Sequence, residues 1–172
     1  MTHLIGIDLG GTKTEIVVLS ENLKILHRER FITNTAGGQK KLINDVYLNY
    51  KKIVQKFNNP KHKLGIGIPG RISSSTKKLN NSTIQCFNGA PIKKLFEDKF
   101  NLKINFENDA NCFALAESIL GAGKNYSSVY GLIMGTGCGG GLIIDKKIYK
   151  GQNNNASEIG HTVLSNKSEQ CF

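Results

Sequence analysis

Residues 4–19 read LIGIDLGGTKTEIVVL, and this stretch decides the fold. Two apolar segments with strand-forming side chains, residues 4–8 and 14–19, are separated by a short link that contains Gly10 and Gly11. A short link with glycine between two such segments favours a tight turn. The stretch therefore predicts a β-hairpin, which residues 24–31 extend into a meander of three strands.

The turn of this hairpin has the composition of a phosphate-binding loop. Gly10 and Gly11 lack Cβ atoms, so backbone N–H groups can approach a phosphate closely. Thr12 adds a hydroxyl group, and Lys13 adds a positive charge. Asp8 ends the preceding strand, where its carboxylate can hold Mg²⁺ directly or through water. An ordinary glycine hairpin with a capping aspartate explains the same residues, and both interpretations stay open.

A second glycine cluster, GTGCGGG at residues 135–141, directly follows an apolar segment. It matches the dinucleotide-binding pattern G-x-G-x-x-G through Gly135, Gly137 and Gly140. That pattern must open a helix, whereas residues 141–145 are strand-like, so a nucleotide-linked dehydrogenase is the weaker hypothesis. The P-loop pattern G-x-x-x-x-G-K-[ST] does not occur. Two glycine turns between strands instead suggest two hairpins that hold one polyphosphate from opposite sides.

The rest of the chain alternates helices and strands. Apolar residues at three- and four-residue spacing predict helices at residues 39–57, 91–100 and 108–120. Strands are predicted at residues 64–68, 103–106 and 128–134, a hairpin at 141–149, and a loop at 73–89. This is the order of an α/β fold in which a second sheet has only begun.

Composition excludes several classes of protein. The 172 residues are 39% apolar and 21% charged, which does not fit a disordered chain. No apolar run approaches the roughly 20 residues needed to cross a bilayer, and no signal peptide is recognisable, so a cytoplasmic protein without membrane contact is predicted. The formal charge is +10, but 20 of the 23 cationic side chains are scattered lysines, which favours a solvated surface over nucleic-acid binding. Four cysteines without a CxxC pair predict reduced thiols.

The segment ENDAN at residues 107–111 places an acidic side chain where a predicted strand gives way to a helix. A carboxylate at that position lies at the edge of the sheet, so Asp109 can accept a proton from a substrate hydroxyl group. Helix capping by Asn108 or Asp109 explains the same residues. The two glycine clusters are what favour the catalytic interpretation.

A further polar segment, EIGH at residues 158–161, offers a carboxylate and an imidazole three residues apart. Glu158 and His161 together suit the adjacent hydroxyl groups of a sugar. Cys171 follows His161 by ten residues, but two ligands cannot complete the tetrahedron of a zinc site.

Five motifs follow one another along the chain: IDLGGTKTE (7–15), GIGIPG (65–70), NDANC (108–112), MGTGCGGG (134–141) and EIGH (158–161). In this order they resemble the ROK family of sugar kinases and sugar-responsive repressors. The resemblance implies the actin-like ATPase fold, an α/β fold with two ribonuclease H-like lobes. Residues 1–120 would form the N-terminal small lobe and residues 121–172 the start of the C-terminal large lobe. The chain is therefore expected to be an N-terminal fragment of a longer kinase.

The resemblance also implies roles for single residues. Asp109 would be the catalytic base, and sugar contacts would come from Asn81, Asn108, Asp109, Glu158 and His161. The ATP phosphates would be held by the two glycine turns, namely Asp8, Gly10, Gly11, Thr12 and Lys13 in the first and Gly135, Thr136, Gly137, Cys138, Gly139 and Gly140 in the second. Mg²⁺ would accompany ATP, with Asp8 as a ligand. In the full-length protein a structural Zn²⁺ would use His161 and Cys171, and the protein would be a homodimer.

The segment at residues 80–91, NNSTIQCFNGAP, resembles the fructokinase branch of the family. Phosphorylation of fructose is therefore the predicted activity, with N-acetylglucosamine kinase and glucokinase as the alternatives. A sugar-responsive repressor is less favoured, because repressors of this family carry a helix-turn-helix ahead of the first strand. Here only Met1 and Thr2 precede that strand.

Overall fold

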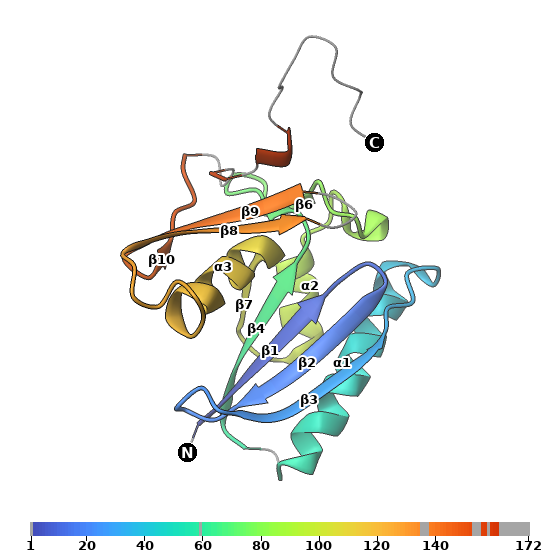
Figure 1. The fold of residues 1–172 in the computed structure, drawn as a ribbon. Helices are drawn as coiled ribbons and strands as arrows, with labels where there is room; N and C mark the ends of the chain where they lie inside the picture. The colour runs from blue at the N-terminus through green and yellow to red at the C-terminus, as the bar shows by residue number, and fades with distance from the viewer. Residues whose placement is uncertain (1, 59, 135–137, 153–155, 158, 162–172) are drawn as a thin grey trace. The chain divides into compact units, whose positions relative to one another are not determined.

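The computed structural model describes residues 2–58, 60–134, 138–152, 156–157 and 159–161 (Figure 1). The chain divides into two compact units, Met1–Asp109 and Ala110–Phe172. Each unit has a sheet of its own. The lobe boundary expected after residue 120 stays a prediction.

The first unit is built on a five-stranded sheet with the order β3-β2-β1-β4-β7. Its strands are β1 (His3–Leu9), β2 (Lys13–Leu19), β3 (Ile25–Ile32), β4 (His62–Ile68) and β7 (Ile104–Asn108). The first three strands form the predicted antiparallel meander, and β4 and β7 run parallel to β1. The carboxyl ends of β1, β4 and β7 therefore meet at one edge of the sheet, which is where open α/β sheets bind ligands.

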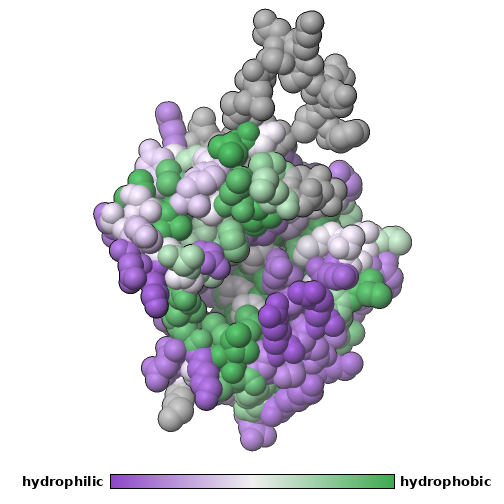
Figure 2. All heavy atoms as spheres, viewed as in Figure 1, coloured by the Kyte–Doolittle hydropathy of each residue, from purple (hydrophilic) through white to green (hydrophobic). Residues whose placement is uncertain are grey.

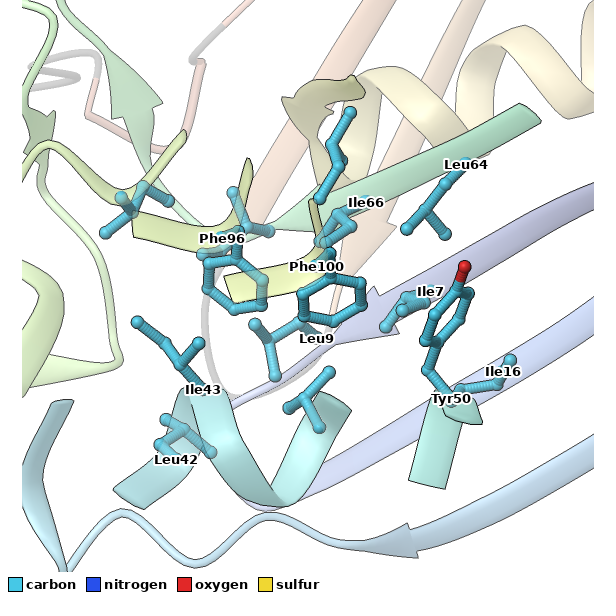
Figure 3. Packing of buried hydrophobic residues seen from close by; sticks show 14 of the residues in the cluster. Ile7, Leu9, Ile16, Leu42, Ile43, Tyr50, Leu64, Ile66, Phe96 and Phe100 are labelled. Atoms are coloured by element: carbon cyan, nitrogen blue, oxygen red, sulfur yellow. The ribbon is translucent and has the colours of Figure 1, made fainter. Parts of the chain in front are cut away.

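Two helices, α1 (Gly38–Lys56) and α2 (Ile92–Phe100), lie on one face of this sheet (Figure 1). They confirm the helices predicted at residues 39–57 and 91–100. Apolar residues at helical spacing turn one side of each helix toward the strands, where they form a continuous core (Figure 3). The largest fully buried side chains of this core include Phe87, Phe96, Ile7, Leu9 and Ile16.

The opposite face of the sheet carries charged side chains. Side chains alternate between the two faces of a strand, so the residues between the buried ones of β1 and β2 point away from the helices. Asp8 lies opposite Glu15, and Glu15 lies opposite Arg30. Figure 2, drawn in the view of Figure 1, shows hydrophilic residues gathered over β2 and β3.

The segment predicted as a loop at residues 73–89 is more ordered than expected. It contains β6 (Leu79–Asn80), which pairs with β5 (Arg71–Ile72), and a short 3₁₀ helix, η1 (Gln85–Phe87). The side chain of Asn88, which follows η1, is bonded back to the backbone of Ser82. Its Oδ1 accepts from Ser82 N at 2.9 Å, and its Nδ2 donates to Ser82 O at 3.0 Å. Side-chain hydrogen bonds thus order a segment whose residue spacing predicts only a loop.

The second unit contains a three-stranded sheet with the order β10-β9-β8. Its elements are α3 (Asp109–Ile119, starting at the last residue of the first unit), β8 (Ser128–Met134), β9 (Cys138–Ile144), β10 (Lys147–Ile148) and the 3₁₀ helix η2 (Ile159–His161). The predicted hairpin around residues 145–146 is confirmed, and both residues of its turn are left-handed, with φ of 48° at Asp145 and 61° at Lys146.

Candidate functional site

The hairpin between β1 and β2 turns at Gly11 and Thr12. Gly10 N donates to Lys13 O at 3.1 Å, which closes the turn. A Cβ atom at Gly10 would lie 2.8 Å from that same carbonyl oxygen, so only glycine fits there. Within the described residues, the amide groups of Gly11 and Thr12 have no hydrogen-bond acceptor. The turn therefore presents two free donors beside the exposed side chains of Thr12 and Lys13, a donor set that fits phosphate oxygens.

Asp8 lies at the carboxyl end of β1, on the face of the sheet that carries the charges. The residue is exposed, yet enough of the protein surrounds its carboxylate that desolvation raises its pKa. The negative charges of Asp109 and Glu15 raise the pKa of Asp8 further, and the positive charge of Arg30 opposes them. Asp8 and Asp109 are thus close enough to repel each other, and a bound cation or a proton would relieve this repulsion.

Asn108 and Asp109 follow one another at the carboxyl end of β7. Asn108 Nδ2 donates to Gly70 O at 3.1 Å, which ties the end of β7 to the loop after β4. Gly70 is left-handed, with φ of 93°, and a Cβ atom there would lie 2.6 Å from Asn80 O. Because a side chain at Gly70 would collide with Asn80, glycine is required where the loop after β4 passes close to β6. Asp109 opens α3, where the helix N-terminus favours its negative charge.

The loop after β6 lies against the glycine turn between β1 and β2. Thr83 Oγ1 would be 3.7 Å from a Cβ atom placed on Gly11. Asn81, an expected sugar contact, is exposed and has a left-handed backbone with φ of 56°. Asn81 and Thr83 are therefore both on a loop that reaches the hairpin, within the first unit.

Three charged residues of the first unit had no predicted role. Arg28 Nε donates to Glu15 Oε1 at 2.7 Å, and Arg30 Nε donates to Glu15 Oε2 at 2.7 Å. Desolvation acts to raise the pKa of Glu15, but the hydrogen bonds and charges of both arginines outweigh it and hold that pKa below its usual range. The alternation of charged and apolar residues in β2 and β3 was the sequence signal for this cluster, but only the strand register shows that its members meet.

In the second unit, the glycine cluster is a strand for most of its length. Cys138, Gly139 and Gly140 belong to β9, which corrects the expectation that they form the turn; Gly135, Thr136 and Gly137 lie outside the described residues. Cys138, Gly139 and Gly140 pair antiparallel with residues 132–134 of β8. Gly141, which follows them in β9, faces α3. A Cβ atom there would lie 2.7 Å from Ala110 O and 2.7 Å from the Cβ atom of Ala114, so α3 packs directly on the strand backbone.

The EIGH segment approaches the start of β9. A Cβ atom at Gly160 would lie 2.2 Å from Cys138 O, so glycine is required where η2 meets this strand. The backbone of His161 belongs to η2. Glu158 and Cys171, expected as a sugar contact and a zinc ligand, lie outside the described residues.

Neither a metal cluster nor a membrane helix is found in the described part of the chain. No group of three or more histidine, cysteine, aspartate or glutamate side chains is placed to hold a metal ion among the described residues. None of the described helices is long and apolar enough to cross a membrane. The zinc and magnesium ligands named above therefore stay predictions.

Comparison with known protein sequences finds sugar kinases among the relatives of this chain. The sequence profile of the ROK family matches residues 4–172. The N-acetyl-D-glucosamine kinase of Aliivibrio salmonicida is 38% identical over 159 residues, which make up 92% of this chain and 52% of that enzyme. The chain thus spans about half the length of the curated relative it matches.

Solved structures agree with this match. The ROK hexokinase from Thermus thermophilus superposes with a TM-score of 0.83 at 27% identity, over 99% of this chain and 56% of that one. The ROK family glucokinase from Streptomyces griseus, solved in complex with glucose and AMPPNP, has a TM-score of 0.79 at 28% identity, over 95% of this chain and 51% of that one. The α/β fold is thus the actin-like ATPase fold of the ROK sugar kinases, of which this chain covers a part.

Proposed function

Because this chain belongs to the ROK family, we propose that its protein is an ATP-dependent sugar kinase with N-acetyl-D-glucosamine as its substrate. The name of the A. salmonicida relative supports this sugar, and the glucokinase and hexokinase neighbours support a hexose. Fructose, predicted from residues 80–91, is not named in these relatives. N-acetylglucosamine, the earlier alternative, therefore takes its place, and glucose becomes the second candidate.

The observation that carries this proposal is that two carboxylates lie at the same end of the first sheet, one on β1 and one directly after β7, with β4 between these strands. Asp8 is the last residue but one of β1, Asp109 directly follows β7, and the negative charge of Asp109 raises the pKa of Asp8. Phosphoryl transfer to a hydroxyl group needs an acceptor for the hydroxyl proton and a cation beside the transferred phosphate. Two carboxylates at the carboxyl ends of parallel strands of one sheet suit both needs.

In this proposal, Asp109 orients the sugar hydroxyl group and accepts its proton as the oxygen attacks phosphorus. The amide groups of Gly11 and Thr12, with the Lys13 ammonium, bind phosphate oxygens and stabilise the charge that develops there. Asp8 would hold the magnesium ion. ATP supplies the transferred phosphoryl group, and Mg²⁺ offsets its negative charge.

The remaining expected roles are part of the same proposal. Further phosphate contacts would come from the second glycine cluster, Gly135 to Gly140, and further sugar contacts from Asn81, Asn108, Glu158 and His161. The zinc site with His161 and Cys171 and the homodimer concern the complete protein and are proposed for it alone.

The test is phosphorylation by the complete natural protein of N-acetylglucosamine, glucose, fructose and N-acetylmannosamine, with ATP consumption as the readout. N-acetylglucosamine is expected to give the highest kcat/KM. The proposal would be contradicted if the protein phosphorylated none of these four hexoses. A preference for fructose would restore the prediction from residues 80–91.

The role of Asp109 is tested by Asp109→Asn, which keeps the shape of the side chain but removes the proton acceptor. The expected result is a loss of turnover on the order of 10² or more, with sugar binding nearly intact. Asp98→Asn is the matched control, since Asp98 is an exposed residue of α2 that pairs with Lys94. Turnover of Asp109→Asn equal to that of the control would remove Asp109 from the role of base.

A further inference from the structure

The outward face of β1, β2 and β3 carries a row of charges across neighbouring strands. Asp8, Glu15 and Arg30 are cross-strand partners in register. Arg28 lies two residues from Arg30 on β3, and both arginines converge on Glu15. Two carboxylates directly opposite each other are unfavourable in a sheet. The row is tolerated because each carboxylate has a guanidinium group within electrostatic reach.

The arginines are shared unequally between the two carboxylates. Glu15 takes the Nε donors of Arg28 and Arg30, and it also takes Arg30 Nη2 at 2.6 Å. The positive charge of Arg30 reaches Asp8 and acts on it. Yet within the described part of the chain no hydrogen bond or ion pair joins Asp8 to Arg30 or to another cation. Arg30 is thus near enough to influence Asp8 but is bonded to Glu15.

We propose that Glu15 is a positioning residue that keeps the Arg30 guanidinium group bonded to itself and away from Asp8, so that the Asp8 oxygens stay available to a magnesium–nucleotide ligand. This inference rests on the proposed function. Glu15 is suited to the task because its side chain is only 18% exposed, whereas those of Arg28 and Arg30 are 58% and 56% exposed. The carboxylate is therefore the fixed partner, and the guanidinium groups are held by it.

Removing the Glu15 charge has a definite electrostatic consequence. A released Arg30 would find Asp8 as the neighbouring carboxylate, and a guanidinium group binds a carboxylate through two parallel N–H donors. The Asp8 oxygens would then be occupied by the protein itself. Arg28 is not expected to do the same, because Arg28 lies opposite Val17, two residues further along β2 than Glu15, which is opposite Asp8.

The experiment measures the dissociation constant of magnesium ATP by titration calorimetry with the complete protein, beside its thermal unfolding temperature. Glu15→Gln is expected to weaken binding by about ten-fold. Adding Arg30→Gln to Glu15→Gln is expected to restore binding to within about three-fold of the wild type. Adding Arg28→Gln instead is not expected to restore it.

Glu29→Gln is the matched control. Glu29 is also a paired carboxylate of this sheet, but it bonds to His27 and Lys56 on the helix-covered side of β3. Its loss should leave the magnesium ATP affinity unchanged. Should Glu15→Gln not fold, Glu15→Asp serves in its place, because its shorter side chain no longer reaches both arginines.

Two results would overturn the inference. One is wild-type affinity in Glu15→Gln; the other is a loss that Arg30→Gln does not reverse, which would assign Glu15 a purely structural role. Failure of the proposed function is distinguishable, since it would appear in the wild-type protein as an absence of magnesium ATP binding and of sugar phosphorylation.

Discussion

The two units of this chain are packed on different principles. The first unit buries large side chains between its sheet and two helices, with Phe87 and Phe96 fully covered. In the second unit, the buried residues of α3 are the small Ala110, Ala114 and Ser118. There the helix packs on strand backbone rather than on large side chains.

The surface of the second unit reflects this difference. Among the described residues of β8, Leu132 is 42% exposed and Met134 is 80% exposed. In the first unit Ile5, Ile7 and Leu9, which alternate along β1, are all buried. The first unit therefore supports its own site, because the ends of β1 and β7, which position Asp8 and Asp109, are fixed by a buried core. In the second unit, the position of α3 on the sheet depends on a few close contacts with the backbone of β9.

The largest effect that tests this comparison is expected from Phe96→Ala. Phe96 is fully buried, and its ring centroid lies 6.0 Å from that of Phe87 and 5.5 Å from that of Phe106. Truncation removes these contacts and leaves a cavity, so the first unit is expected to lose about 3–5 kcal/mol of its free energy of unfolding. Amide hydrogen exchange of β1 and β4 measures this loss.

The control for Phe96→Ala is Leu132→Ala in β8. Since Leu132 is partly exposed, exchange in β8 and β9 should change by less than about 1 kcal/mol. Comparable losses from both substitutions would show that the two units are packed alike, which would refute the distinction drawn between them.

The second unit should be most sensitive where a glycine faces α3. Gly141→Ala places a methyl group 2.7 Å from Ala110 O, so α3 must move away from β9. We expect a loss of about 2 kcal/mol in the free energy of unfolding, measured by exchange of the α3 amides. Gly139→Ala is the control, because its methyl group would lie 3.6 Å from the Cβ atom of Ala110, an ordinary contact. Equal stability of the two variants would contradict close backbone packing.

The sequence predicted those elements whose signal is local. The helix α1 was found because Leu42, Val46, Tyr50 and Ile53 recur at helical spacing and are all buried. The hairpin at β1 and β2 was found because its glycine turn lies between two apolar runs. In both cases neighbours along the chain determine the structure.

The failures occurred where distant residues decide. Three glycines in a row have little intrinsic tendency to form a strand, yet Gly139 to Gly141 are part of β9 because they pair in register with residues 131–133 of β8. Likewise, Glu15 and Arg30 are 15 positions apart in the sequence, and only the register of β2 and β3 brings them together. Neither close approach nor register can be read from composition or periodicity.

A smaller effect is expected in the first unit, where the free energy of unfolding should depend on pH through Tyr50. The Tyr50 hydroxyl group lies 2.6 Å from His62 Nε2, while His62 Nδ1 donates to Pro60 O at 2.7 Å, so Tyr50 is the donor to His62. Burial, with a smaller contribution from Tyr47, raises the pKa of Tyr50 from 10.0 to about 12. In the unfolded chain the group ionises near 10. Its stabilising contribution is therefore complete below pH 10 and is lost as the pH rises toward 12.

This pH effect is measured by comparing the wild type with Tyr50→Phe in urea unfolding. The stability advantage of the wild type over the variant should shrink by about 2 kcal/mol between pH 10 and pH 12. An advantage that stays constant over this range would show that Tyr50 is not shielded from solvent in the folded state.

The smallest effect concerns a clamp in the second unit. Lys146 Nζ lies within hydrogen-bonding distance of four backbone carbonyl oxygens, at 2.6 Å from Ser118 O, 2.9 Å from Lys124 O, 3.0 Å from Tyr126 O and 3.2 Å from Gly123 O, and its three N–H donors are shared among them. These carbonyls belong to the C-terminus of α3 and the loop after it, where a positive charge is favourable. Lys146→Met keeps a long side chain and the left-handed turn but loses the donors.

We expect Lys146→Met to cost about 1 kcal/mol, because the group is partly open to water, which can replace some of the lost bonds. Faster hydrogen exchange at residues 118–126, with no change in β1 or β4, would measure it. Lys147→Met removes an equal charge from the adjacent, exposed position and should leave this exchange unaltered. Equal acceleration in both variants would mean that net charge, rather than the four carbonyl contacts, connects β9 and β10 to α3.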